Sequence, residues 1–209
     1  HNGVERLQKK QGPKKPVILF VGRMVAEKGV LELAEAAAQI LPNHPEWQLC
    51  LAGAKGFEVA EKSPYEKQVE SALVRLGAQA QMTGFLPYAD IRTLQGEAAI
   101  IACPSLWQDP MPKVVLEALA AGSALLASRR GGIPEAAEGR AHIVDDPNVD
   151  TLASAIEQLI ADDSYRNSLQ QAAWADFPFT AKQMAADADA ARNAAISAPV
   201  ERQKHGLGG

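Results

Sequence analysis

The sequence predicts an α/β protein built on a doubly wound parallel sheet, and two features of the residue pattern support this. Short apolar or β-rich runs alternate with stretches of helical periodicity, at intervals that suit successive βαβ units. The strand-like runs are continuously apolar, as expected when helices cover both faces of a parallel sheet. Such a sheet is Rossmann-like, and it binds its ligand at the carboxyl ends of its strands.

Six short apolar or β-rich runs are the predicted strands; the first of them reads VILFV and the fourth reads AAIIAC. The strands lie at residues 17–21, 47–52, 80–83, 98–103, 124–128 and 142–144. The intervening stretches carry apolar residues at helical spacing, and three more helical stretches close the chain. The predicted helices lie at residues 29–41, 65–76, 89–95, 114–121, 134–138, 149–161, 164–173 and 180–195.

The chain has 209 residues, of which 47% are hydrophobic and 22% charged, and this is enough to bury the core of one domain. We assign that domain to residues 17–196. Residues 197–209 are polar and Gly-rich, which predicts a flexible tail. The sequence starts at His1 rather than at Met, and we expect it to be a piece of a longer protein.

The charge and the cysteines narrow the classes of partner and compartment. A formal net charge of −4 argues against a nucleic acid or a general membrane surface as partner, because both usually require a concentrated basic patch. Cys50 and Cys103 lie inside apolar runs, which predicts buried thiols in a reducing compartment. No apolar run is long enough to span a membrane. We therefore expect a cytoplasmic protein.

Four groups of residues follow predicted strands, and the first group begins at Gly22. Gly22 allows a tight turn, while Arg23 and Lys28 bring two positive charges to the start of the next helix. This combination predicts a binding site for a diphosphate. The alternative is that both cations are surface charges, one of them paired with Glu27, because the segment lacks the Gly-rich patterns of dinucleotide and P-loop sites.

The second group is the turn that follows the third predicted strand, at residues 83–87, and it contains Phe85 and Leu86. An apolar turn with free backbone amides and carbonyls can stack against a flat base and recognise its edge. The alternative interpretation is a hydrophobic turn that covers the edge of the sheet.

The third group contains two carboxylates, Asp109 and Glu117, with seven residues between them. If the intervening residues are helical, both carboxylates lie along one helix edge, about 12 Å apart, and can grip both ends of an elongated polar ligand. Alternatively, Asp109 before Pro110 is a helix N-cap, and Lys113 pairs with Glu117 on the helix surface. Glu117 lies in an otherwise apolar helix, however, where a charged group needs a partner such as vicinal hydroxyls.

The fourth group, Ser128 to Glu135, follows the fifth predicted strand. Gly131 and Gly132 permit a ligand to approach the backbone closely, and a helix that begins at Pro134 directs its amides toward the same crevice. Alternatively, this segment is an ordinary helix entry, in which Glu135 interacts favourably with the helix dipole.

Taken in this order, the four groups resemble the C-terminal, nucleotide-sugar-binding domain of GT-B retaining glycosyltransferases of the family-4 type. The segment VGRMVAEKG at residues 21–29 is similar to that family's phosphate-binding segment. The segment PSLWQDPMPKVVLEALAAG at residues 104–122 is similar to its Glu-x7-Glu region, and GGIPE at residues 131–135 completes the set. The first residues, HNGV, are similar to the link that precedes this domain in the family, so we interpret residues 1–16 as an interdomain linker.

The resemblance implies a role for each matching residue. Arg23 and Lys28 would neutralise the donor diphosphate and stabilise it as a leaving group. Asp109 would lie near the donor sugar, Glu117 would hold the ribose hydroxyls, and these four are the implied catalytic residues. The full set of implied donor-binding residues is Gly22, Arg23, Lys28, Phe85, Leu86, Asp109, Met111, Pro112, Lys113, Val114 and Glu117.

The implied reaction transfers a hexose from a UDP- or GDP-linked donor to a glycan or a lipid-linked acceptor, with retention at the anomeric carbon. It uses no metal and no cofactor besides the donor substrate. In this family the acceptor is bound by an N-terminal domain, so we expect the fragment to be inactive alone. Polysaccharide or lipopolysaccharide synthesis is compatible with this reaction, as is peripheral association of the full-length protein with the inner face of a membrane.

One departure from the family pattern keeps other classes open. Asp109 stands where the family usually has Glu, and its shorter side chain draws the carboxylate back by roughly 1.5 Å. This change fits a non-catalytic nucleotide-binding or partner-docking module, which is the main alternative. A dinucleotide-dependent oxidoreductase is a weaker one, because it requires a Gly-x-Gly-x-x-Gly segment after the first strand.

A metal site is not predicted. Asp187 and Asp189 match the Asp-x-Asp pattern of metal-dependent glycosyltransferases, but side chains two residues apart on a helix diverge. His44, His142 and His205 are scattered without the spacing of metal ligands.

Overall fold

The computed structural model describes residues 3–7, 12–54, 56, 61–175 and 177–197. In this part of the chain, six parallel strands form one sheet in the order β3-β2-β1-β4-β5-β6. The strands are β1 (Lys15–Val21), β2 (Gln48–Ala52), β3 (Ala80–Gly84), β4 (Ala98–Cys103), β5 (Ala124–Ser128) and β6 (Ala141–Val144). The structure thus confirms all six predicted strands and the doubly wound, Rossmann-like order.

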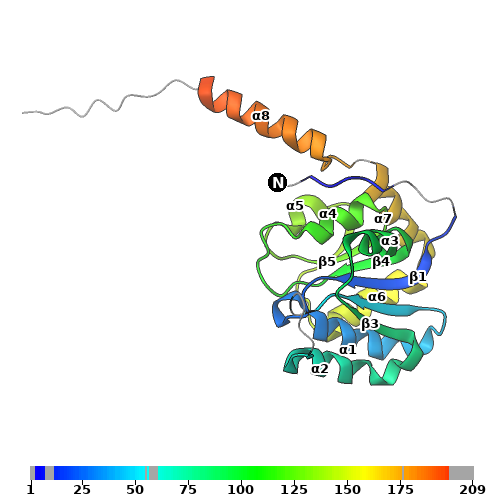
Figure 1. The fold of residues 1–209 in the computed structure, drawn as a ribbon. Coiled ribbons are helices and arrows are strands. Elements are labelled where there is room, and N and C mark those ends of the chain that lie inside the picture. Colours follow the sequence, from blue (N-terminus) through cyan, green and yellow to red (C-terminus); the bar gives the residue numbers. More distant parts are fainter. Residues whose placement is uncertain (1–2, 8–11, 55, 57–60, 176, 198–209) are drawn as a thin grey trace, which may run out of the picture.

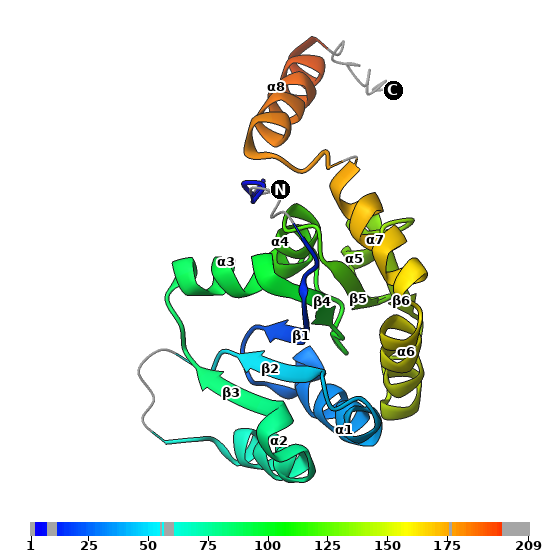
Figure 2. The same cartoon turned by 90° about the vertical axis from the view of Figure 1, so that its right-hand side faces the viewer.

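Helices cover both faces of this sheet (Figure 1). They are α1 (Val30–Ile40), α2 (Pro64–Leu73), α3 (Tyr88–Glu97), α4 (Lys113–Ala120), α5 (Ile133–Ala137), α6 (Val149–Ala161), α7 (Asp163–Ala175) and α8 (Ala181–Ser197). The described part of the chain also contains the short 3-10 helices η1 (Ala26–Lys28), η2 (Leu41–Asn43) and η3 (Val74–Gln79). Helices α1, α2 and α6 pack on one face, and α3, α4, α5 and α7 pack on the other (Figures 1 and 2).

Alternate residues of the central strands enter two separate hydrophobic cores. In β4, Ile100 and Ala102 enter the core under α1 and α6, whereas Ile101 and Cys103 enter the core under α4 and α5. All residues of β4 are buried. The apolar runs in the sequence are therefore continuous because each strand is covered on both faces.

Two predictions about the helices differ from the structure by more than the shifts of one or two residues seen at the other helix ends. The helix predicted at residues 65–76 ends at Leu73, and the chain continues as η3, in which Gly77 has a non-helical φ of 50°. Helix α4 begins at Lys113 and has Pro112 at its N-cap, so the predicted N-cap at Asp109 is wrong. The residue before a proline is disfavoured in the α conformation, and this restriction applies to both Asp109 and Met111. Asp109 and Glu117 therefore do not share one helix edge.

The segment at residues 3–7 packs on the face that carries α4 and α7. The buried Val4 donates its amide hydrogen to the carbonyl of Phe179 at 3.0 Å. The Arg6 guanidinium lies over the Trp174 ring, 4.3 Å from the ring centroid, and also donates to the Trp174 carbonyl. These contacts join the first described residues to the end of α7 and to the segment that follows it.

Helix α8 stands away from the sheet and its two helical layers in both views (Figures 1 and 2). The tail predicted at residues 197–209 lies outside the described residues, apart from Ser197 at the end of α8. None of the helices in the described part of the chain has the length and the apolar character needed to cross a bilayer.

Candidate functional site

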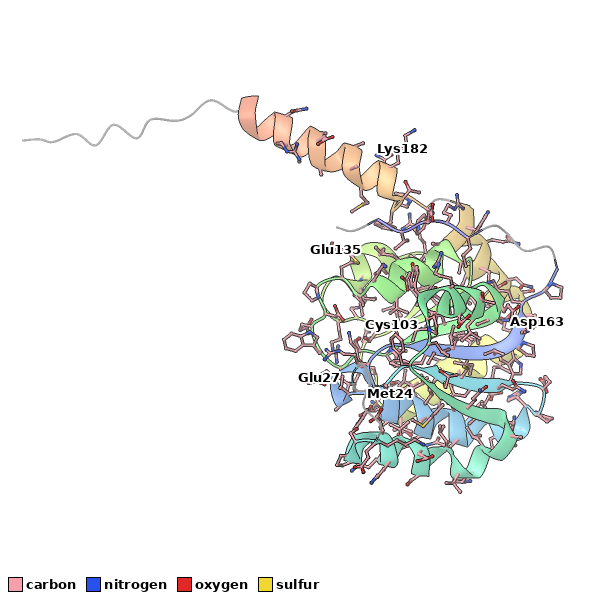
Figure 3. The ribbon with its side chains drawn as sticks, in the orientation of Figure 1. Met24, Glu27, Cys103, Glu135, Asp163 and Lys182 are labelled. Carbon is pink, nitrogen blue, oxygen red and sulfur yellow. The ribbon has the colours of Figure 1, made fainter. Side chains whose placement is uncertain are left out.

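The sheet order reverses between β1 and β4, so the loops that follow these strands frame a crevice at the carboxyl edge of the sheet. Gly29 has a φ of 67°, and an added Cβ would lie 2.0 Å from the carbonyl oxygen of Pro104. A glycine is thus required where the two loops touch. The carbonyl of Glu27 accepts hydrogen bonds from the amides of Leu106 and Trp107 at 2.9 and 3.3 Å. Figure 3 labels Glu27 near the edge of the molecule and Cys103, at the end of β4, closer to its middle.

Lys28 and Asp109 form an ion pair across this crevice, with a hydrogen bond from Nζ to Oδ2. Their side chains are 22% and 14% exposed, so the pair is partly shielded from water. The sequence marks both residues as site candidates and leaves a pairing with Glu27 open; the structure shows that Lys28 pairs with Asp109 instead. Any anion that binds Lys28 must therefore compete with the Asp109 carboxylate.

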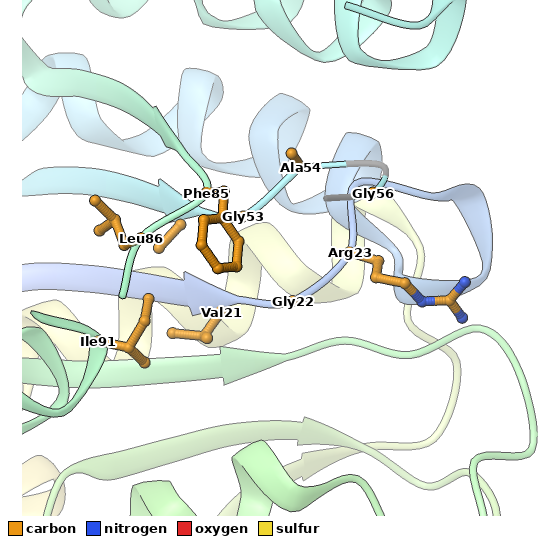
Figure 4. Close-up of a pocket in the computed structure, with 10 residues that line it drawn as sticks. Val21, Gly22, Arg23, Gly53, Ala54, Gly56, Phe85, Leu86 and Ile91 are labelled. Carbon is orange, nitrogen blue, oxygen red and sulfur yellow. The ribbon is translucent and has the colours of Figure 1, made fainter. Parts of the chain in front are cut away.

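A cavity of about 360 Å³ opens at the carboxyl ends of β1, β2 and β3 (Figure 4). Its size is typical of a small-molecule site. The structure brings four predicted site residues together in its wall, and the neighbouring side chains are apolar. The lining includes Val21, Gly22, Arg23, Phe85, Leu86 and Ile91. Such a wall suits a flat ring that is connected to an anionic group.

Arg23 lines the cavity from the loop that follows β1. Figure 4 shows its side chain extending away from Phe85 and Leu86. The side chain is exposed, and within the described residues no hydrogen bond or ion pair engages its guanidinium. Arg23 is therefore available to an anionic ligand, in contrast to Lys28.

The turn after β3 forms part of the cavity wall. Phe85 is 58% exposed there, while the half-buried Leu86 packs against the core. The backbone of this turn is not entirely free, because the carbonyl of Gly84 accepts a hydrogen bond from the amide of Gly53 at 2.9 Å. Gly53 has a φ of 138°, and an added Cβ would lie 1.9 Å from the carbonyl oxygen of Gly22. The close packing of these three loops depends on that glycine.

Glu117 is buried on α4, with 7% of its side chain exposed. Its Oε1 accepts a hydrogen bond from the Tyr88 hydroxyl at 3.2 Å and lies 3.4 Å from Lys113 Nζ. Its Oε2 accepts a hydrogen bond from Gln95 Nε2 at 2.9 Å. The predicted pair with Lys113 is confirmed, but the argument that this carboxylate needs an external partner is wrong, since the protein itself supplies three.

The remaining residues implied for donor binding lie outside the cavity wall. Met111 and Val114 are partly buried and pack against the core. Pro112 is buried, and Lys113 is 58% exposed, with its Nζ 4.8 Å from the centroid of the Tyr88 ring. Lys28, Asp109 and Glu117 do not line the cavity either. The residues implied for donor binding therefore fall into two groups, one in the cavity wall and one around α4 and the loop before it.

The glycine pair after β5 has a different role from the one predicted. Added Cβ atoms at Gly131 and Gly132 would lie 1.9 Å from the carbonyl oxygen of Asp109 and 1.7 Å from that of Pro110. The amide of Gly131 donates to Gln108 Oε1 at 2.6 Å, and the amide of Gly132 donates to the Asp109 carbonyl at 2.8 Å. The group that approaches this backbone closely is the loop after β4 itself. α5 begins at Ile133 rather than at Pro134.

The two thiols are buried and free, as predicted. Burial raises the pKa of Cys103 to about 11 and also raises the pKa of Cys50. A thiol is a poor nucleophile at neutral pH under these conditions. Cys103 lies below the crevice as a packing residue.

No cluster of three or more His, Cys, Asp or Glu side chains that could hold a metal ion occurs among the described residues. Asp189 on α8 pairs with Arg192 at 3.2 Å. The side chain of Asp187 lies outside the described part of the structure.

Sequence reasoning missed Tyr88, Gln95 and Gly53. The side chains of Tyr88 and Gln95 reach Glu117 from α3, which is remote from Glu117 in sequence. No local pattern identifies such a contact. A glycine directly after a strand was a usable signal for Gly53, because this position often requires a positive φ or a close backbone approach.

The fold is a Rossmann-like domain with a cavity at the carboxyl edge of its sheet. Residues 4–175 match the family described as "Glycosyl transferases group 1", and the chain belongs to this family. It is similar to the putative glycosyltransferase YtcC of Bacillus subtilis (strain 168), with 32% identity over 158 residues that cover 74% of this chain and 39% of that protein. The chain spans about two fifths of the length of the curated relatives it matches.

Solved structures give the same fold. HepE of Anabaena in complex with UDP has a TM-score of 0.71 and 24% identity, over 85% of this chain and 49% of that chain. The C-terminal domain of the group 1 glycosyl transferase LpcC from Francisella tularensis has a TM-score of 0.64 and 24% identity, over 78% of this chain and 84% of that chain. The fold is therefore that of the C-terminal domain of GT-B glycosyltransferases, as predicted.

Proposed function

We propose that this domain binds the donor of a retaining glycosyltransferase, which transfers a hexose from a nucleoside diphosphate sugar to a glycan or a lipid-linked acceptor. The observation that carries the proposal is the cavity at the carboxyl ends of β1, β2 and β3, where apolar walls adjoin the free cation of Arg23. The structure of HepE with UDP supports a uridine diphosphate donor. GDP remains the other candidate from the sequence.

In this proposal the base occupies the cavity against Phe85 and Leu86, and the diphosphate lies along the backbone at Gly22. Arg23 binds the diphosphate directly, because its guanidinium has no competing partner in the described structure. Lys28 joins it by exchanging the Asp109 carboxylate for phosphate oxygens. The exchange frees Asp109 to accept a hydrogen bond from a hydroxyl of the donor sugar.

Glu117 holds the ribose. A carboxylate offers about four acceptor positions, and the hydrogen bonds from Tyr88 and Gln95 use two of them. Tyr88 and Lys113 are 56% and 58% exposed, so both can move aside for a ligand. Met111, Pro112 and Val114 shape the loop and the helix start beside the donor.

Transfer breaks the bond between the anomeric carbon and the diphosphate oxygen, and the bonding electrons leave with the nucleoside diphosphate. The acceptor oxygen forms its new bond on the same face of that carbon and gives up its proton. Negative charge grows on the leaving diphosphate, and the cations of Arg23 and Lys28 lower the energy of that transition state. They supply the charge for which other enzymes use a metal ion.

The acceptor would be bound by the part of the protein that this chain lacks, and the fragment alone would be inactive. The two buried free thiols favour a cytoplasmic location. The full-length protein would meet a lipid-linked acceptor at the inner face of a membrane.

Calorimetric titration of the domain with UDP, GDP and ADP tests the proposal. One diphosphate should bind, and Arg23→Ala should weaken its affinity about tenfold, which is the usual contribution of a hydrogen bond to a charged group. Arg75→Ala is the matched control, because Arg75 is also exposed but lies in η3, before β3 rather than after it. Equal losses in both variants, or binding of no diphosphate, would contradict the proposal.

A non-catalytic nucleotide-binding or partner-docking module is the second candidate, and one observation favours it. Lys28 already pairs with Asp109, and Glu117 already accepts hydrogen bonds from its protein neighbours. Internal pairing of this kind is expected in a site that no longer binds a substrate. Single-turnover transfer by the full-length protein separates the two: a module would bind the diphosphate without consuming its sugar conjugate.

A further inference from the structure

A chain of hydrogen bonds connects the first described segment with Glu117. The carbonyl of Glu5 accepts from Arg92 Nη2 at 2.8 Å, and Arg92 Nη1 donates to Gln95 Oε1 at 2.9 Å. Gln95 Nε2 then donates to Glu117 Oε2 at 2.9 Å. Three elements far apart in sequence are joined here: residues 3–7, α3 and α4.

The polarity of each link determines the next one. A guanidinium only donates hydrogen bonds and a carboxylate only accepts them, so the side chain between them must do both. Arg92 binds the oxygen of the Gln95 amide and thereby directs the nitrogen toward Glu117. A carboxylate or an apolar group at position 95 could not connect Arg92 with Glu117.

Burial separates the fixed partner of Glu117 from the movable ones. Gln95 is fully buried and bonds to Oε2, whereas the exposed Tyr88 and Lys113 face Oε1. Gln95 therefore holds the carboxylate from the protein interior. A ligand can displace the other two partners without disturbing this bond.

A second contact ties the same segment to α4. The amide of Leu7 donates to the carbonyl of Ala120 at 3.1 Å, in the last turn of the helix that carries Glu117. The buried Ser123 hydroxyl, just after α4, donates to the carbonyls of Gln95 and Ala98 at 3.1 and 3.0 Å. Residues 3–7 thus contact both helices that determine where Glu117 lies.

We propose that Gln95 and Arg92 are positioning residues for Glu117, and that residues 3–7 control the donor site through them. The inference rests on the proposed function, in which Glu117 holds the ribose of the donor. A displacement of this segment would then change the recognition of the ribose hydroxyls while leaving the base cavity and Arg23 unchanged. The site could in this way respond to the position of whatever precedes the domain.

Titration of the 209-residue chain with UDP and with 2′,3′-dideoxy-UDP tests this inference. The wild type should bind UDP at least tenfold more tightly than the dideoxy analogue. Gln95→Met keeps the length of the side chain but removes the bond to Glu117. We expect it to bind UDP about tenfold more weakly and the analogue as before, because only the hydroxyl-dependent contact is lost.

Arg92→Met should shift the same ratio in the same direction by a smaller factor, and Arg92→Lys should restore part of it, since lysine can still donate. Arg75→Met is the matched control and should leave the ratio unchanged. General destabilisation would weaken both ligands equally, and thermal unfolding of each variant measures it independently.

The outcomes distinguish the two proposals. A wild type that binds UDP and the analogue equally would show that Glu117 does not hold the ribose, and both would fail at that point. A wild type that prefers UDP, with Gln95→Met and Arg92→Met keeping the full preference, would overturn the positioning role alone.

Discussion

The two carboxylates of this crevice, Asp109 and Glu117, are held in different ways. Asp109 lies in a loop, where its carboxylate pairs with the single cation of Lys28 and both side chains are partly exposed. Glu117 lies on a helix, where a buried amide holds one oxygen and two exposed groups face the other. The loop carboxylate can exchange its partner, whereas the helix carboxylate is oriented before any ligand arrives. Preorganisation of this kind reduces the cost of binding at Glu117.

The contact between the loops after β1 and β4 can be broken at Gly29. Gly29→Ala should lower the free energy of unfolding by about 3 kcal/mol or more, because the new Cβ collides with the Pro104 carbonyl and the φ is positive. Gly77→Ala is the control, since its φ of 50° imposes similar strain but no atom lies within 4 Å of the added Cβ. Urea denaturation measures both, and equal losses would show that the loop contact contributes nothing.

Substitution of the helix carboxylate should have the largest effect on binding. Glu117→Gln replaces one acceptor oxygen with a donor, so one ribose hydroxyl loses its partner. We expect UDP affinity to fall about tenfold to a hundredfold, in line with hydrogen bonds to charged groups. Calorimetry provides the measurement, and an unchanged affinity would exclude Glu117 from the donor site.

Substitution of the loop carboxylate should act in the opposite direction. Asp109→Asn removes the negative charge that competes for Lys28, and its neutral amide leaves Lys28 free for phosphate oxygens. Affinity for UDP should stay equal or rise by roughly threefold, because a partly exposed ion pair is weak and little is gained by removing it. Transfer by the full-length protein should fall, because the contact to the donor sugar is lost. Weaker UDP binding would show that Asp109 contacts the diphosphate region itself.

Salt should separate the two cations. Arg23 is exposed and Lys28 is partly shielded, so added salt screens Arg23 more strongly. The loss in UDP affinity caused by Arg23→Ala should therefore shrink between low and high ionic strength, by a factor of roughly two to three. The loss caused by Lys28→Ala should change less. The same salt dependence in both variants would contradict this distinction.

The smallest expected effect comes from Tyr88, one of the two movable partners of Glu117. Tyr88→Phe removes the hydroxyl of an exposed side chain, which donates to Oε1 at 3.2 Å, while the bond from Gln95 remains. The free energy of unfolding should change by less than about 0.5 kcal/mol in chemical denaturation. A loss close to that of a buried hydrogen bond would mean that Tyr88 is a fixed partner.

The sheet could be predicted from sequence because strands that are buried on both faces are continuous apolar runs, such as VILFV in β1. The carboxylate geometry could not, although a local signal was present. Two prolines in Asp109 to Pro112 push the residues before them out of the α conformation, and this restriction outweighs the preference of Asp and Pro for a helix start. The helix begins three residues after Pro110 as a result.

The contacts that determine the site are long-range and carry no local record. Lys28 and Asp109 are 81 residues apart, and Gln95 and Glu117 are 22 apart. Lys28 and Asp109 were both identified as site candidates, but a single sequence does not indicate which charged side chains form an ion pair with each other. The glycines after β5 were recognised as a close approach; only the structure shows that the approaching group is the loop after β4.

The hydrogen bond between Val4 and Phe179 has a consequence for the modularity of this fold. The polypeptide enters and leaves the three-layered body at one point, with the Arg6 and Trp174 side chains stacked beside it. A unit whose ends lie together can be exchanged between different proteins by grafting at a single junction. Grafting at this junction would join the domain to different neighbouring domains without rebuilding its core.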